Sequence, residues 1–216
     1  MMKIGDKLHA LMEIGLKTAS GFLPGPASAA FNAVYDNVKS GVLTKRAEKW
    51  KEEVVARLEK LESDYDSLVN NESFATALIK TSELAVKTES DEKRKLLADS
   101  LINTYIQSTN EDKSMFFLSL VEKYTILHIQ IIRYLHDEYM TETFPLRMRP
   151  TFIVLFRLKF KDIDHIYLEK VVNDLQNDYI VTAYNKDSPV FVMNKRMELL
   201  TKLGEEFYTF LKPTDE

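Results

Sequence analysis

The sequence has no cysteine and few residues that interrupt helices. Its 216 residues include six glycines and six prolines. The absence of cysteine excludes disulfide bonds and thiol chemistry, and it fits a reducing compartment. The scarcity of glycine and proline leaves long windows in which helices can form, so the chain is predicted to be mostly α-helical.

Long apolar runs are also missing. Charged residues such as Lys3, Asp6 and Lys7 interrupt the N-terminal stretch, which is therefore not a signal peptide. No later apolar run reaches the roughly 18 residues that a membrane-spanning helix needs. We expect a cytoplasmic protein for which a membrane is an unfavoured partner.

Motifs for catalysis and cofactor binding are lacking as well. The sequence contains no Gly-x-Ser-x-Gly elbow, Walker-type loop or dinucleotide-binding loop. No two of its histidines have the i, i+4 spacing of a helical metal site; they are His9, His128, His136 and His165. We expect no catalytic residue, no cofactor and no metal, and a function that is not enzymatic.

The composition is that of a globular protein, with 45% hydrophobic and 29% charged residues. A chain of this length can hold one large domain or two small ones, each with its own core. The formal net charge is -4, so the molecule as a whole is not an evident binder of polyanions.

Apolar residues at helical spacing predict a helical bundle domain over residues 1–112. Its clearest helix runs from Thr44, a candidate N-cap, to Leu68. The stripe of this helix follows spacings of three and four and consists of Trp50, Val54, Leu58, Leu61, Tyr65 and Leu68. This stripe either packs inside the bundle or mediates self-association. Its regular part is shorter than a coiled coil requires, which favours packing inside the bundle.

Other segments complete this bundle. Residues 1–20 predict an amphipathic helix that either docks on the body or lies on a membrane surface. Residues 70–73 break the chain before a helix over 74–87, and Ser90 is predicted to cap the helix that follows.

The remaining residues, 113–216, predict a domain that contains helices and one β-hairpin. The apolar stretch 115–140 is expected to be interrupted at Thr125, which would cap a new helix. A later helix is predicted to begin after Asp164 and to end near Asn177-Asp178. Residues 180–184 predict a strand and 185–189 a turn, and the returning strand is either 190–193 or 197–200. A last helix has Thr201 as its N-cap and Gly204 at a close approach to the hairpin.

Two resemblances accompany this pattern. The phrase LQNDYIV…LLTKLGEEFYTFL resembles the end of many bacterial winged-helix domains, which supports a winged-helix-like fold over residues 113–216. The segments NESFATALIKTSELAVKTESDEKRKLLADSLIN and FFLSLVEKYTILHIQIIRYLHD are similar to little-characterised bacterial proteins of the Abi-alpha-like, abortive-infection-associated type. This second resemblance implies a bundle fused to a winged helix, and a role in phage defence, but no catalytic residues.

Basic residues are unevenly distributed in the second domain. No acid occurs between Glu142 and Asp162, although five cations do. Together with cations of the wing, they form the predicted nucleic-acid-binding set: Arg147, Arg149, Arg157, Lys159, Lys161, Lys186, Lys195 and Arg196. The alternative is that these cations cover acids of the same domain or of a partner.

The helix that would read DNA in a winged helix has the opposite charge. Residues 160–180 contain two cations and five acids, which is unfavourable near phosphates. Our first hypothesis is therefore a non-enzymatic protein that acts through protein–protein contacts with an unknown partner or by self-association through the Thr44–Leu68 helix. The alternatives are a DNA-binding regulator that contacts phosphates and, more weakly, a membrane-surface effector that uses residues 1–35.

Overall fold

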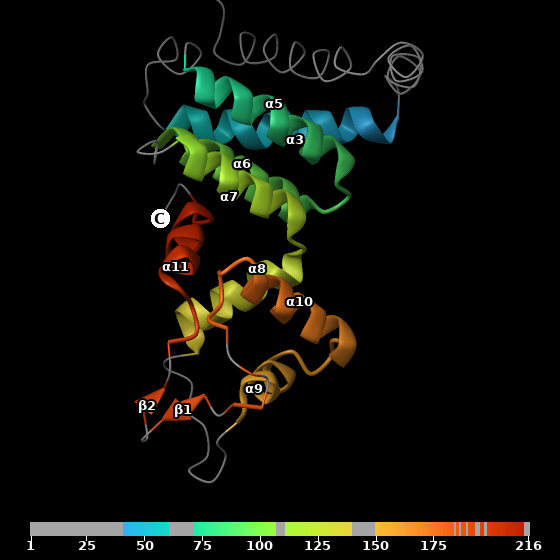
Figure 1. The fold of residues 1–216 in the computed structure, drawn as a ribbon. Helices are drawn as coiled ribbons and strands as arrows, with labels where there is room; N and C mark the ends of the chain where they lie inside the picture. Colours follow the sequence, from blue (N-terminus) through green and yellow to red (C-terminus); the bar gives the residue numbers. More distant parts are fainter. Residues whose placement is uncertain are drawn as a thin grey trace, which may run out of the picture. The chain divides into compact units, whose positions relative to one another are not determined.

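The structure is a computed structural model that describes residues 41–60, 71–106, 111–139, 150–183, 185, 187–188, 190–192, 195–196 and 198–213. Most of these residues are helical, as the sequence predicted. The chain divides into two compact units (Figure 1). The first includes the described residues up to Lys123 and those from Phe210 onward, and the second runs from Tyr124 to Thr209. The expected helix over residues 1–20 lies outside the described residues.

The part of the first unit that the structure describes is a bundle of α3 (Val42–Lys60), α5 (Glu72–Lys87), α6 (Asp91–Ile106) and α7 (Glu111–Lys123). Helix α6 packs against each of the other three. It is therefore buried on all sides over residues 96–104. Four of those buried residues are polar. Three of them, Asp99, Asn103 and Thr104, bond through their side chains within the unit; for example, Asn103 Nδ2 donates to the Phe210 and Lys212 carbonyls, both at 2.9 Å.

Helix α3 uses its apolar stripe inside this bundle. Trp50, Val54 and Leu58 are buried, and α3 packs on α5 and α6. The Trp50 indole also donates to Ser82 Oγ at 2.9 Å. The stripe residues after Lys60 lie outside the described residues, so the structure accounts for the first half of the predicted stripe.

Side-chain caps precede two helices of the first unit. The cap at Ser90 was predicted, whereas Asn71 lies within the break predicted over residues 70–73, and α5 begins at Glu72 and not at residue 74. Asn71 Oδ1 accepts the Phe74 N–H at 2.8 Å before α5, and Ser90 Oγ accepts the Lys93 N–H at 3.1 Å before α6. The prediction that Thr44 caps α3 is wrong. The helix begins at Val42 because its first backbone bond already runs from Lys45 N to the Gly41 carbonyl, at 3.4 Å.

The two units separate after α7. Helix α7 packs on α5 and α6, and Phe117 contacts Phe210 with ring centroids 5.3 Å apart. The division accordingly falls between Lys123 and Tyr124, whereas the sequence placed the domain boundary between residues 112 and 113.

The second unit contains α8 (Ile126–Arg133), the π-helical turn η1 (Tyr134–Glu138), α9 (Phe152–Lys159), α10 (His165–Asn177) and α11 (Lys202–Phe210). Helix α10 packs on α8 and α9. Helix α8 begins directly after Thr125, as predicted. Helix α10 begins where the acids predicted it, because Asp164 Oδ1 accepts the Tyr167 N–H at 2.9 Å.

Short extended segments follow α10. Strands β1 (Phe191–Val192) and β2 (Lys195–Arg196) pair antiparallel, and an isolated antiparallel bridge joins Val181 to Leu200. Thr182 N donates to the Leu199 carbonyl at 2.8 Å. Of the two candidate partners for the segment after α10, the structure therefore selects the one that ends at Leu200.

Helix α11 approaches this segment closely. Thr201 Oγ1 accepts the Gly204 N–H at 3.0 Å, which confirms Thr201 as the N-cap. A Cβ atom added at Gly204 would lie 2.2 Å from the Ile180 carbonyl oxygen. The predicted close approach is therefore confirmed, and it requires glycine.

No single helix within the described ranges is long and apolar enough to cross a membrane. The segments Glu111–Lys123 and Ile126–Glu138 meet that test of length and composition only when they are taken together.

Candidate interaction surface of the second unit

The predicted nucleic-acid-binding set is only partly covered by the structure. Arg147, Arg149 and Lys186 lie outside the described residues, and Lys195 and Arg196 belong to β2, of which the backbone alone is described. The set can therefore be examined at its three remaining side chains, those of Arg157, Lys159 and Lys161.

Two of these three cations are bound to acids of the same unit. Arg157 on α9 pairs with Glu169 on α10, and both side chains are about one-third exposed. Lys159 pairs with Glu138 at the end of η1, and its Nζ atom lies 5.0 Å from the centroid of the Tyr134 ring. Lys161 is exposed. This arrangement favours the alternative in which these cations cover acids of their own domain.

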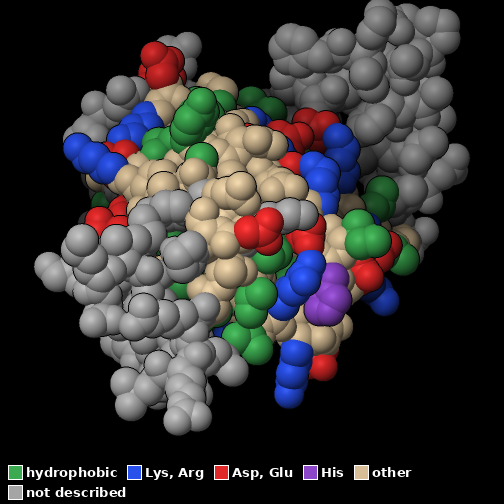
Figure 2. All heavy atoms as spheres, turned by 60° about the horizontal axis from the view of Figure 1, so that its bottom comes forward, with side chains coloured by type: hydrophobic (Ala, Val, Ile, Leu, Met, Phe, Trp, Pro, Cys, Tyr) green, Lys and Arg blue, Asp and Glu red, His purple; other side chains and the backbone are tan. Residues whose placement is uncertain are grey.

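The charged side chains can also be viewed over one face of the molecule. Among the side chains coloured in Figure 2, Lys and Arg lie beside Asp and Glu and do not gather into one continuous block. Phosphate binding depends on several cations that face one groove. The described part of this face does not present such a groove.

The acids of α10 are also engaged. Glu169 binds Arg157, and Asp174 binds Lys170 one turn away. Asp178 accepts the Tyr124 hydroxyl at 2.8 Å. Most of the acids in this helix and directly after it are therefore bound by side chains of the same unit.

The outward side of α10 carries a different set of side chains, which we call the outer stripe. Its members have spacings of four, three and four and are all exposed: Ile166, Lys170, Asn173 and Asn177. Ile166 is 81% exposed, although it is aliphatic. The opposite side of the helix is apolar and buried, with Leu168, Val171, Val172 and Leu175. In the sequence, the three polar members of the stripe lie between or just after those buried positions, whereas nothing in this spacing marks Ile166 as exposed.

A buried polar cluster connects α10 to the start of α8. The His128 ring stacks on Tyr124 with centroids 4.7 Å apart, and its Nε2 atom lies 3.8 Å from Asp174 Oδ2. Its Nδ1 atom accepts the Thr125 N–H at 3.1 Å. Burial, followed by the hydrogen bond to Asp178, raises the pKa of the Tyr124 hydroxyl, which therefore stays protonated.

A second histidine joins η1 to α11. His136 stacks on Tyr208 with centroids 3.7 Å apart. Its Nδ1 atom lies 2.8 Å from Asp137 Oδ1, and its Nε2 atom lies 3.3 Å from Glu205 Oε2. Tyr208 donates its hydroxyl to the same Asp137 oxygen at 2.5 Å. Within the described parts of the chain, however, no three His, Asp or Glu side chains are grouped so that they could hold a metal ion.

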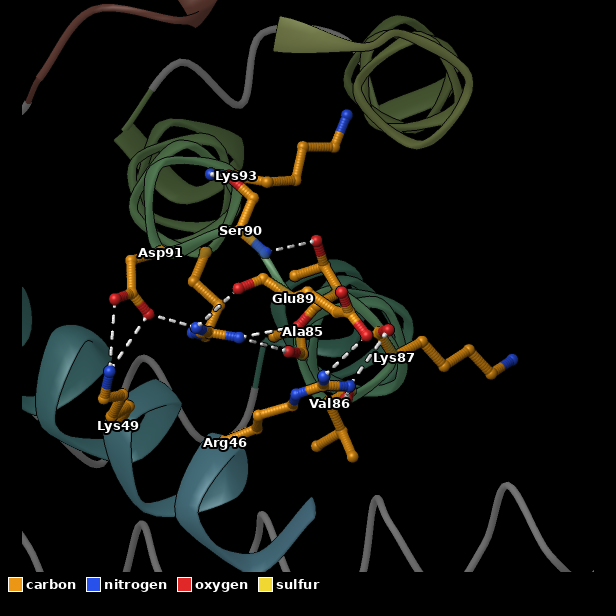
Figure 3. Close-up of polar contacts among 11 residues, drawn as sticks. Arg46, Lys49, Ala85, Val86, Lys87, Glu89, Ser90, Asp91 and Lys93 are labelled. Atoms are coloured by element: carbon orange, nitrogen blue, oxygen red, sulfur yellow. Dashed lines mark hydrogen bonds and ion pairs between the residues drawn. The ribbon is translucent and has the colours of Figure 1, made fainter. Parts of the chain in front are cut away.

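Arginines in the first unit bind backbone rather than ligand (Figure 3). Arg94 is 3% exposed and donates to the Thr88 carbonyl at 2.7 Å, beyond the end of α5. Arg46 reaches the Lys87 carbonyl at 3.4 Å and the Glu89 carboxylate at 3.2 Å. These groups satisfy carbonyls at a helix C-terminus, so the cluster stabilises the α5–α6 turn.

The acid in that turn, Asp91, is bound by two cations. Hydrogen bonds from Arg94 and then Lys49 hold the pKa of the Asp91 carboxyl below its usual range. The cluster therefore keeps its ion pairs at neutral pH and offers no unbound cation pair to an anion.

Comparison of the chain with protein-family models, with curated proteins and with solved structures finds no match.

Proposed function

We propose that this chain is a non-enzymatic protein-interaction protein, in which a helical bundle carries a winged-helix-like unit that binds a protein partner through the outer stripe of α10. The observation that carries the proposal is the pairing of Arg157 and Lys159 with acids of their own unit. Those cations are engaged, while α10 exposes an aliphatic residue and two amides. Such a surface suits a protein contact better than a phosphate backbone.

The order of elements supports the winged-helix interpretation. Helix α8 with η1, then α9 and α10, precede the β1–β2 pair. Phe152 N donates to the Ser188 carbonyl at 2.8 Å, and Val190 N donates to the Pro150 carbonyl at 3.3 Å. These bonds join the segment before α9 to the chain that leads into β1. In the winged-helix interpretation, α10 would correspond to the reading helix.

DNA binding is the second candidate, and one observation favours it. Asn173 and Asn177 lie one turn apart on the outer stripe, and asparagine amides can bond the edge of adenine in the major groove. This candidate needs phosphate contacts from cations, for which Arg147 and Arg149 are the predicted source.

Binding to a fluorescent duplex separates the two candidates. Anisotropy would be measured at about 50 mM and about 200 mM salt, a range over which six or more phosphate contacts weaken binding by roughly a thousandfold. We expect no salt-dependent binding by the native chain. Tight binding at low salt that is lost at higher salt and in the Arg147→Glu, Arg149→Glu variant, but kept in Lys202→Glu on α11, would instead establish the DNA-binding function.

The role in phage defence is a hypothesis that rests on the Abi-alpha-like resemblance alone. It predicts that cells producing the chain plate phage less efficiently than cells with an empty vector. The Ile166→Asp variant, which charges the outer stripe without touching the core, should restore plating if the stripe is the contact surface. Equal plating by all three strains would refute the role.

A further inference from the structure

The two nitrogens of the His128 ring face different groups: Nδ1 faces the cap residue of α8, and Nε2 faces an acid of α10. The side chain is 6% exposed and belongs to the first turn of α8. Thr125 precedes it by one turn, and Asp174 faces it from α10. Imidazole is the side chain whose charge changes most readily between pH 5 and 8, so its contacts depend on its proton count.

The neutral ring is held in one tautomer. Its Nδ1 atom accepts the Thr125 backbone N–H at 3.1 Å and lies 2.9 Å from Thr125 Oγ1. An accepting Nδ1 carries no proton, so the proton of the neutral ring is on Nε2. This N–H faces Asp174 Oδ2, but the distance of 3.8 Å is too long for a hydrogen bond.

We propose that His128 is a pH-sensitive switch: when the ring gains a second proton it releases the Thr125 N–H, binds Asp174 Oδ2, and so weakens the pairing of Asp174 with Lys170 on the outer stripe. The added proton occupies Nδ1, which then can no longer accept from Thr125 N. The positive charge attracts Asp174, and closure by about 1 Å brings Nε2 to the length of a charge-assisted hydrogen bond.

Lys170 binds the other oxygen of the same carboxylate. Its Nζ atom pairs with Asp174 Oδ1, whereas His128 Nε2 faces Oδ2. The Lys170 side chain is 67% exposed, so its ion pair is screened by water and contributes little, while a charged imidazole that is 6% exposed depends on its counter-ion. Asp174 therefore moves toward His128 and neutralises Lys170 less completely.

The other groups around the ring permit this exchange. Helix α10 contributes Asp178 as a second acid, bonded to the Tyr124 hydroxyl. Tyr124 itself stays neutral, and α11 contributes the apolar Phe207 against it, with ring centroids 5.8 Å apart. Lys170 is thus a cation that opposes protonation, and the two acids of α10 favour it.

The switch bears on the proposed function because Lys170 belongs to the outer stripe. Acidification would leave the positive charge of Lys170 on this face less completely neutralised. Contact with a partner through this face would therefore change with pH, and this last step rests on the proposed function, whereas the exchange at His128 does not.

NMR of the isolated full chain tests the switch without any partner. We would follow the Thr125 amide and the His128 ring between about pH 7.5 and pH 5, the range in which imidazole titrates. The expected result is one shared midpoint for the two signals. Two variants give opposite shifts: Asp174→Asn removes the counter-ion and moves the midpoint to lower pH, whereas Lys170→Met removes the competitor and moves it to higher pH.

The native chain, recorded under the same conditions, is the reference for both variants. The proposal is overturned if the Thr125 amide is unchanged while the His128 ring titrates. It is also overturned if the ring remains neutral throughout, or if the two variants shift the midpoint in the same direction or not at all. Because no partner is present, each of these outcomes is independent of whether the proposed function holds.

Discussion

Tyr179 lies just after α10 in a backbone conformation that suits glycine. Its φ angle is 59°, and its N–H donates to the Gln176 carbonyl at 3.0 Å while the Ile180 N–H donates to the Leu175 carbonyl at 2.9 Å. These two bonds define a Schellman motif, whose left-handed residue is usually glycine. The Tyr179 side chain is 73% exposed, so its packing does little to offset the free-energy cost of this backbone conformation.

Replacement by glycine should therefore stabilise the second unit. A left-handed conformation costs an L-residue about 1–2 kcal/mol, which glycine avoids. The greater conformational freedom of glycine in the unfolded chain reduces this gain in stability by about 0.4–1 kcal/mol. We expect Tyr179→Gly to raise the free energy of unfolding by about 0.5–1 kcal/mol. The matched control is Tyr179→Ala, which removes the same exposed ring but keeps the backbone penalty, and it should change stability by less than about 0.5 kcal/mol.

Native-state hydrogen exchange is the suitable assay because the chain has two compact units. The Ile180 amide, bonded to Leu175, reports opening of the second unit. Its exchange should slow by about two- to fivefold in Tyr179→Gly. The single tryptophan, Trp50, belongs to the first unit, so its fluorescence during denaturation is an internal control that should not move.

Equal exchange rates in the glycine and alanine variants would refute the reasoning, because they would show that the left-handed backbone carries no cost. A glycine variant that is less stable than the native chain would show instead that the exposed ring stabilises the unit.

Three further predictions concern packing and charge. Gly204→Ala should destabilise the second unit by about 1–3 kcal/mol, as its Cβ would clash with the Ile180 carbonyl; exchange of the Ile180 amide would quicken, and unchanged exchange would contradict the close approach. Burial lowers the pKa of Lys93 to about 8 from an unfolded value near 10.5, so the unfolded chain holds more protons above pH 8 and stability should rise by about 1.5 kcal/mol from pH 8 to 9.5. Urea denaturation of Lys93→Met should lack this rise, and an identical pH profile would disprove its origin. Arg57→Met should cost about 3–5 kcal/mol by the same assay, because it removes the guanidinium 2.5 Å from the buried Asp99 carboxylate; the double variant with Asp99→Leu should recover most of the loss if charge is the cause.

Local chemistry in the sequence determined several element boundaries. Ser90 and Thr201 begin helices through hydrogen bonds to a backbone N–H three residues ahead, and Thr125 stands directly before α8. Such contacts need only neighbouring residues, so their signal is contained in a short window. Gly204 was likewise predictable, because few residues other than glycine tolerate a close backbone approach.

Local pattern alone failed at Thr44 and could not select a strand partner. The α3 start depends on a backbone bond to Gly41 that no side-chain preference marks. The bridge from Val181 to Leu200 joins segments separated by a turn and by β1–β2, and two candidate segments had similar β propensity.

The candidate site was decided mainly by tertiary structure. The sequence supplied the cations and the acid-rich helix, but it did not pair Arg157 with Glu169, twelve residues away, or Lys159 with Glu138, twenty-one residues away. The buried side of α10, with Leu168, was predictable from its apolar spacing, but the exposure of Ile166 was not. A count of charges along the chain weights all charged residues equally, whereas in the folded chain some charges are paired and others are exposed. The sequence thus determined the helices and several of their ends, and the packing of α8, α9 and α10 decided which of their side chains remain available to a partner.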